Sequence, residues 1–167
     1  MGGCLLVLAG LAGTAHAAAP VRVGIMRFAG TGETEIRGAV TWLIGKQNFA
    51  LIGAKALEDA EEVSGKPLNT KDGIKAVGEE LTLAAIFDGR VEIERGVATA
   101  RIAIRDPKDG SIVANETWSV KRGGSKALVK LLVQTFWLKM GPALEDLTGQ
   151  EINVPRRAKR GHGRHSS

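Results

Sequence analysis

The sequence predicts an α/β or α+β domain, in which a mixed sheet of about five strands carries helices packed on it and the chain ends in a long helix. Two observations lead to this fold class. A strand, a helix and a second strand follow one another near the start, and this order implies a right-handed parallel crossover. Three later strand-like segments are separated only by turn signals, so they predict a β-meander of antiparallel strands.

The first predicted elements alternate between strand and helix. Residues 21–28 form a mostly apolar, β-rich run, as expected of a strand covered on both faces, and residues 29–32 interrupt it. A helix opens at Thr34, a residue type favoured at N-caps, and residues 45–48 indicate its end. Residues 49–52 follow as a short strand. The apolar face of the helix comprises Ile36, Val40, Leu43 and Ile44.

Two further helices are predicted before the meander. An acidic stretch over residues 57–63 indicates a brief exposed helix. The next helix is capped by Asn69 or Thr70. Gly73 and Gly78 each weaken it by roughly 1 kcal/mol relative to alanine. Its apolar face comprises Ile74, Val77 and Leu81.

The meander is predicted from alternation and from turn residues. Residues 85–94 alternate between apolar and charged side chains, which is typical of a half-buried strand with one wet face. Residues 95–96 turn the chain into a strand over residues 97–105. Proline and glycine within residues 106–110 give a strong turn signal, and residues 112–120 return as the third strand.

The last element is a long amphipathic helix. Ser125 is predicted as its cap. Pro142 is expected to kink or end the helix, because proline cannot donate to the helical ladder. Its apolar stripe comprises Leu128, Leu131, Leu132, Phe136 and Met140.

Four segments carry a resemblance to a known family. Residues 23–28 precede a Gly/Thr loop, residues 49–52 follow the first helix, residues 77–91 join a helix to a Gly-x-Val strand, and residues 102–113 contain a strand that ends in Asp-x-x-x-Gly. This pattern, over about residues 21–145, resembles the periplasmic domain shared by the amino-terminal part of TolB-type proteins and the CsgG family of curli secretion. The resemblance implies a non-enzymatic role in envelope assembly, adaptation or regulation through contacts with another envelope protein.

The N-terminal residues predict export. Residues 1–17 contain the apolar run 5–12, which is too short to span a bilayer, and end with small residues at Ala15 and Ala17, as a signal-peptidase site requires. Cys4 precedes the apolar run instead of following it, so a lipid anchor is not predicted. The mature chain is therefore expected to be periplasmic or envelope-associated, and not to span the membrane.

The charge divides the remainder into a domain, residues 18–150, and a basic, disordered tail, residues 151–167. Of 23 basic residues five lie after Val154, and the other 18 balance the 18 acidic residues. A cationic tail could hold anionic lipid or acidic glycan, and no specific nucleic-acid partner is predicted. The alternative is a tail that only aids solubility. The tail cations are Arg156, Arg157, Lys159, Arg160 and Arg164.

The predicted domain is chemically sparse. It contains no histidine, cysteine or tyrosine, which are frequent in nucleophilic, proton-transfer and transition-metal chemistry. Residues 30–32, Gly-Thr-Gly, lack both the dinucleotide fingerprint and a Gly-Lys-Ser/Thr sequence, so a plain turn is favoured over a phosphate site. We therefore predict no catalytic residue, no cofactor and no metal.

Acidic residues of the meander offer the main alternative. Asp88, Glu92 and Glu94 share one strand face and could serve acid–base chemistry, but interleaved and neighbouring arginines favour cross-strand ion pairs. Asp106 and Asp109 lie in a turn that does not match a calcium loop. The arginines in question are Arg90, Arg101 and Arg105.

Three tryptophans are candidate partner-binding residues. Trp42 lies off the apolar stripe of its helix, Trp118 is on the last strand, and Trp137 lies beside the main stripe of the last helix. Tryptophan often anchors protein interfaces, although ordinary core packing explains the same positions. The sequence thus predicts an exported interaction module, with a tail-driven polyanion binder or a small carboxylate enzyme as alternatives.

Overall fold

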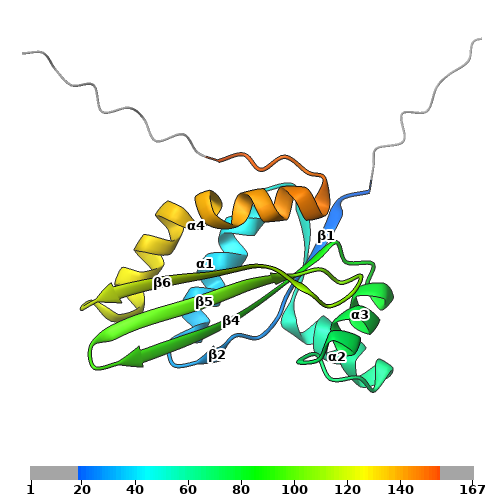
Figure 1. Ribbon diagram of the computed structural model, residues 1–167, viewed down its shortest axis with the longest axis horizontal. Helices are drawn as coiled ribbons and strands as arrows, with labels where there is room; N and C mark the ends of the chain where they lie inside the picture. The colour runs from blue at the N-terminus through cyan, green and yellow to red at the C-terminus, as the bar shows by residue number, and fades with distance from the viewer. Residues whose placement is uncertain (1–18, 155–167) are drawn as a thin grey trace, which may run out of the picture.

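The computed structural model describes residues 19–154, which form a mixed sheet with helices on both faces (Figure 1). The predicted fold class is confirmed, including the meander and the long C-terminal helix. The elements are β1 (Val21–Ile25), β2 (Ala29–Gly30), α1 (Glu33–Gly45), β3 (Phe49–Ile52), α2 (Ala54–Ser64), α3 (Lys71–Glu80), β4 (Ala85–Glu94), β5 (Val97–Arg105), β6 (Ile112–Lys121) and α4 (Gly124–Thr148).

The sheet joins a parallel half to an antiparallel half. Its order is β3-β1-β4-β5-β6, with the short β2 pairing alongside β4. β1 is parallel to β3, as the strand–helix–strand order predicted, and it is also parallel to β4. β4, β5 and β6 form the antiparallel meander, in which Arg90 lies opposite Arg101 and Ala100 lies opposite Trp118. The parallel crossover and the antiparallel meander were therefore predicted correctly, and the structure adds the pairing of β1 with β4.

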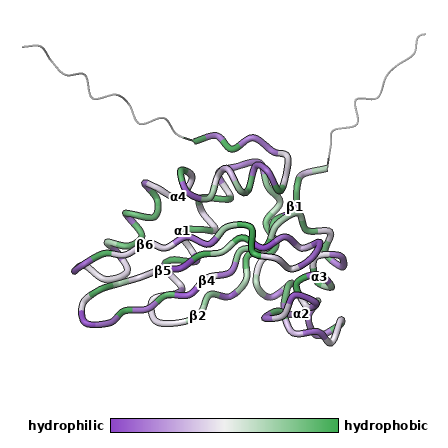
Figure 2. Tube along the Cα trace, viewed as in Figure 1, coloured by the Kyte–Doolittle hydropathy of each residue, from purple (hydrophilic) through white to green (hydrophobic). Residues whose placement is uncertain are grey.

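Apolar side chains form two clusters, one on each face of the sheet. The larger cluster packs α1 and α4 against the sheet around Phe87, Trp118 and Phe136. The smaller one packs α2 and α3 around Leu57 and Ile86. The first three residues of β4 are apolar and buried, with Ala85 and Phe87 in the larger cluster and Ile86 in the smaller, because successive side chains enter opposite layers. From Asp88 onward polar and apolar residues are mixed along the strand (Figure 2).

Several predicted boundaries and caps differ from the structure. β1 ends at Ile25 instead of residue 28, and part of the predicted break forms β2. α1 and α4 begin after the left-handed glycines Gly32 and Gly123, so Thr34 and Ser125 are not their caps. The glycines replace side-chain caps because they adopt positive φ without strain.

The other three helices lie where the sequence predicted them, with differences in length. α2 is longer than the predicted stretch 57–63. Thr70 caps α3, with its Oγ1 accepting a hydrogen bond from the Gly73 amide at 3.0 Å. α4 continues through Pro142 to Thr148, so the proline does not end it, and α4 changes direction along its length in Figure 1.

The packed part of the chain continues past residue 150, where the domain was predicted to end. Ile152 is 4% exposed and belongs to the larger core cluster. The Asn153 amide donates to Gln47 Oε1 at 3.1 Å, and Gln47 Nε2 donates to the Asn153 carbonyl at 3.2 Å. These contacts tie the segment after α4 to the end of α1. The signal peptide, Cys4 and the tail cations lie outside the described residues.

The two glycines of α3 are explained by close approach. A Cβ on Gly73 would overlap the Pro67 carbonyl, and a Cβ on Gly78 would overlap Pro107. A helical glycine normally costs stability, but here it lets neighbouring segments pack against α3.

We expect Gly73→Ala to lower the free energy of unfolding by about 1–3 kcal/mol, because the added methyl group meets fixed backbone. Gly38→Ala is the matched control, since a Cβ there has open space within α1. It should raise the free energy of unfolding by about 0.5–1 kcal/mol. Urea unfolding followed by circular dichroism measures both, and stabilisation by both substitutions would contradict the packing described for Gly73.

We also expect a chain ending at Glu151 to be less stable than one ending at Val154, by about 2 kcal/mol, because the shorter chain loses the buried Ile152 side chain. Both chains lack the basic tail, so the comparison isolates residues 152–154. Equal unfolding midpoints in urea would show that this segment contributes no stability.

Candidate functional site

A crevice opens beside the end of β1, where the helices that follow two neighbouring parallel strands pack on opposite faces of the sheet. β1 leads into α1 on one face of the sheet, whereas β3 leads into α2 on the other. In open α/β sheets, such a switch point at the carboxyl ends of the strands is the usual place for a binding crevice. The crevice has a volume of about 290 Å³. It is lined by Met26, Arg27, Ala54, Leu57, Glu58, Glu61, Pro67, Leu68 and Asn69.

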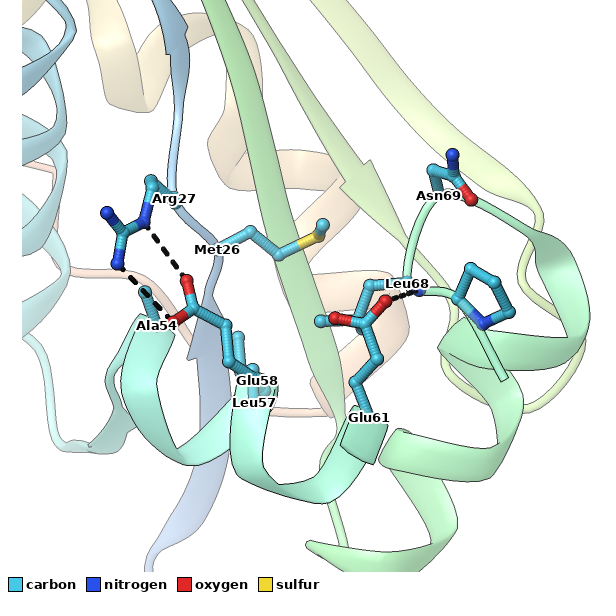
Figure 3. Close-up of a pocket in the computed structure, with 9 residues that line it drawn as sticks. Met26, Arg27, Ala54, Leu57, Glu58, Glu61, Leu68 and Asn69 are labelled. Atoms are coloured by element: carbon cyan, nitrogen blue, oxygen red, sulfur yellow. Dashed lines mark hydrogen bonds and ion pairs between the residues drawn. The ribbon is translucent and has the colours of Figure 1, made fainter. Parts of the chain in front are cut away.

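The charged groups of the crevice all have hydrogen-bond partners within it (Figure 3). Arg27 Nε and Nη2 donate to the two carboxylate oxygens of Glu58 at 3.0 and 3.3 Å. Glu61 Oε1 accepts from the Leu68 amide at 2.8 Å and so holds the segment after α2 against that helix. Because these charges are engaged, the crevice offers mainly an apolar floor, which suits an aliphatic side chain of a partner better than a charged ligand.

The Gly-Thr-Gly segment has a structural role. Gly30 pairs with Val91 in the sheet, and a Cβ on Gly30 would overlap the Val91 carbonyl oxygen. Gly32 occupies the left-handed position that starts α1. Both glycines are therefore explained by backbone geometry, in agreement with the turn favoured from the sequence.

The carboxylates of the meander lie among arginines, as predicted. Asp88 forms an ion pair with Arg105 of the neighbouring strand. Glu92 pairs with Arg90 of its own strand at 2.8 Å. Arg101 lies directly opposite Arg90 on the same sheet face, so it neighbours Asp88 and Glu92 diagonally from the adjacent strand, as predicted.

The turn before β6 orders its own carboxylates. Asp106 Oδ1 accepts from the Lys108 amide and Asp109 Oδ1 accepts from the Ser111 amide, both at 2.8 Å. Hydrogen bonds from Ser111 hold the pKa of Asp109 below its ordinary value. Across residues 19–154 no group of three acidic, histidine or cysteine side chains converges as a metal site would need.

A lysine of α2, Lys55, also has a shifted pKa. The Asp59 carboxylate, 2.8 Å from Lys55 Nζ, raises the pKa of that lysine by a hydrogen bond and by its charge. Lys55 is fully exposed, so this pair is a surface helix pair and does not mark a site.

The structure separates the three tryptophans. Trp118 is 2% exposed and donates from Nε1 to Thr135 Oγ1 at 2.9 Å. Trp137 is 5% exposed and packs nearly perpendicular to Phe136, with ring centroids 4.9 Å apart. Both rings therefore pack in the core and leave no free surface for a partner. Trp42 is 53% exposed, with Lys46 Nζ 5.3 Å from its ring centroid.

The sequence analysis missed the crevice. Its lining comes from the residues that follow β1, from α2 and from the segment before α3, which are separated along the chain and are brought together only by the crossovers. A signal was present, because two consecutive helical connections around one strand imply a switch point, but the sequence could not show on which face each helix packs.

None of the helices in the described part of the chain is long and apolar enough to cross a membrane.

Comparison with known proteins shows the fold. Neither the protein-family models nor the curated proteins gave a match. The chain is similar to lipoprotein GNA1162 from Neisseria meningitidis, with a TM-score of 0.52, 13% identity, and coverage of 73% of this chain and 97% of that one. It is similar to the LpoB C-terminal domain from Escherichia coli, with a TM-score of 0.50, 13% identity, and coverage of 66% and 90%.

The predicted resemblance to a TolB-like and CsgG-like envelope domain is thereby supported in part, for the fold alone. TolB from Acinetobacter baumannii also matches, with a TM-score of 0.46, 8% identity, and coverage of 74% of this chain and 29% of that one. That score is too low to carry an argument, and the likeness to the CsgG family stays a prediction. At these identities the comparisons establish a shared architecture with a bacterial lipoprotein and with the LpoB domain.

We expect Trp137→Ala to lower the free energy of unfolding by about 3–5 kcal/mol, because it empties a buried site beside Phe136. Trp42→Ala, the matched control, should change it by less than about 0.5 kcal/mol, since its ring is largely solvated. Urea unfolding followed by circular dichroism measures both. A large loss for Trp42→Ala would mean that this residue serves the fold instead of a surface.

Proposed function

We propose that this chain is an exported, non-enzymatic module of the bacterial cell envelope that acts by binding another envelope protein. The observation that carries the proposal is the shared architecture with lipoprotein GNA1162 from Neisseria meningitidis, a protein named for its lipid anchor. The composition of the domain supports the same conclusion, because residues 19–154 include no histidine, cysteine or tyrosine.

Two surfaces of the domain suit a protein partner. Trp42 presents an aromatic ring that is more than half exposed, and large aromatic residues supply much of the energy of protein interfaces. The crevice beside β1 has an apolar floor that includes Met26, Leu57 and Leu68, with its charges already paired. In the crevice a partner could bury apolar side chains beside charged groups that already have hydrogen-bond partners.

Export and the basic tail complete the proposal. Residues 1–17 would deliver the chain across the inner membrane as a cleaved signal peptide. The tail cations from Arg156 to Arg164 would add a weak contact with anionic lipid or acidic glycan. In this scheme the folded domain selects the partner and the tail adds electrostatic attraction that salt screens.

Affinity capture from envelope extract at moderate salt tests this function. We expect one discrete protein to be recovered both by residues 18–167 and by a chain ending at Val154, which keeps the buried Ile152. Trp42→Ala should reduce recovery by about tenfold if the ring is an interface anchor. Leu138→Ala, which truncates another exposed apolar side chain, is the control and should leave recovery unchanged.

The competing outcome is equally definite. Capture that requires the residues after Val154 and disappears as salt rises would replace the adaptor function with electrostatic attachment through the tail. Loss of an enzymatic activity on Asp88→Asn or Glu92→Gln, with the fold intact, would instead support a carboxylate enzyme.

A further inference from the structure

One edge of the sheet ends in a long strand with outward-facing backbone groups. β6 spans Ile112–Lys121 and pairs only with β5 within the described part of the chain. Natural proteins usually shorten, twist or cover such an edge, because its N–H and C=O groups form a template for another strand. β6 contains no proline, and its irregularity lies at the first end, where Arg105 pairs with Ile112.

Hydrogen bonds show which residues of β6 face outward. The Arg122 amide donates inward to the Gly96 carbonyl at 2.9 Å. Inward and outward residues alternate in an antiparallel ladder. The Thr117 carbonyl, five residues before Arg122, is correspondingly outward and accepts from Lys139 Nζ of α4 at 3.0 Å. The alternation assigns outward N–H and C=O groups to Asn115, Thr117, Ser119 and Lys121.

Lys139 covers the middle of this edge, but an added strand could take over its hydrogen bond to the Thr117 carbonyl. Its Nζ also contacts Glu116 Oε2 at 2.9 Å and lies 5.0 Å from the centroid of the Trp118 ring. Lys139 supplies a donor to one outward carbonyl and leaves the neighbouring outward groups to solvent. An added strand could donate to the Thr117 carbonyl in its place, while the ion pair with Glu116 persists.

The charge beside the edge selects the partner. From Thr117 to Leu144 the sequence contains no acidic residue. Glu116 is engaged by Lys139, and Glu94 lies on β4, separated from Lys121 by Val97 of β5. An acidic strand would therefore meet complementary charge. The cations placed at the edge itself are Lys121 of β6 and Lys139, whose Nζ contacts the Thr117 carbonyl at 3.0 Å.

A second copy of the chain fits this edge poorly. Antiparallel pairing of two β6 strands about Thr117 would bring the Lys139 ammonium groups of both copies to the same place, with no free acid between them. Like charges placed opposite one another destabilise a strand pair. We propose that the free edge of β6 receives an extended, acidic segment of another protein as an additional strand. This inference rests on the proposed function and gives it a place and a partner chemistry.

The test is amide hydrogen exchange of the isotopically labelled full chain with a short blocked peptide in which Glu alternates with Val and Thr. Strand addition should slow exchange about tenfold at Asn115, Thr117, Ser119 and Lys121. The amides of Glu116 and Trp118 should not change, because they already face β5. Their protection also reports that the fold is intact. Uniform changes along β6, or changes elsewhere only, would overturn the proposal.

Charge variants complete the test. A peptide with Lys in place of Glu should bind about tenfold more weakly, and Lys121→Glu should weaken the acidic peptide to a similar extent. Lys66→Glu makes the same change of net charge in the loop before α3 and should have no effect. Equal binding of both peptides would refute the charge argument. Protection that rises with protein concentration without peptide would assign the edge to a second copy.

The two proposals can fail separately. If a discrete envelope protein is captured equally by the wild-type chain and by Lys121→Glu, and the acidic peptide gives no alternating protection, the adaptor function stands and the edge is not its contact. If the alternating protection appears but no envelope protein is captured, the edge binds acidic strands and the adaptor function falls.

Discussion

The packing around Phe136 fixes α4 on the sheet, and much of the molecule depends on that placement. The centroid of the Phe136 ring lies 6.1 Å from that of Phe87 of β4 and 6.1 Å from that of Trp118 of β6, and Trp137 packs nearly perpendicular to it. Each such aromatic pair contributes about 0.5–1.5 kcal/mol beyond the burial of area. This cluster ties the last helix to strands on both sides of β5.

The position of α4 then determines features at both ends of the fold. It brings Lys139 over the outer edge of β6, where the ammonium group reaches the Thr117 carbonyl. It also directs the following segment back across the core, so that Ile152 is buried and Asn153 pairs with Gln47 at the end of α1. A helix that ended at Pro142 would provide neither the buried Ile152 nor this tie, because both follow from its continuation to Thr148.

The opposite face is covered unevenly, and this leaves room for contacts. α2 and α3 pack mainly over the parallel half, where Leu57, Ile74 and Ile86 form the smaller core. The antiparallel half keeps a polar outer face, where Thr99 and Ser119 share a hydrogen bond at 3.0 Å. The crevice beside β1 borders the smaller core and shares Leu57 and Leu68 with it. A partner bound there would therefore contact the core that contains fewer buried side chains.

The sequence by itself determined the order of elements, the pairing of the meander and the chemical sparseness of the domain, because alternation, turn residues and composition are local properties. It identified Thr70 as a cap but not Gly32 or Gly123, since a glycine start depends on a left-handed backbone conformation and offers no capping side chain to recognise. Only the tertiary structure decided that Trp118 and Trp137 are core residues while Trp42 is exposed, and that β6 is an open edge. Those outcomes depend on which faces and edges come together, and long-range packing sets these independently of any local pattern.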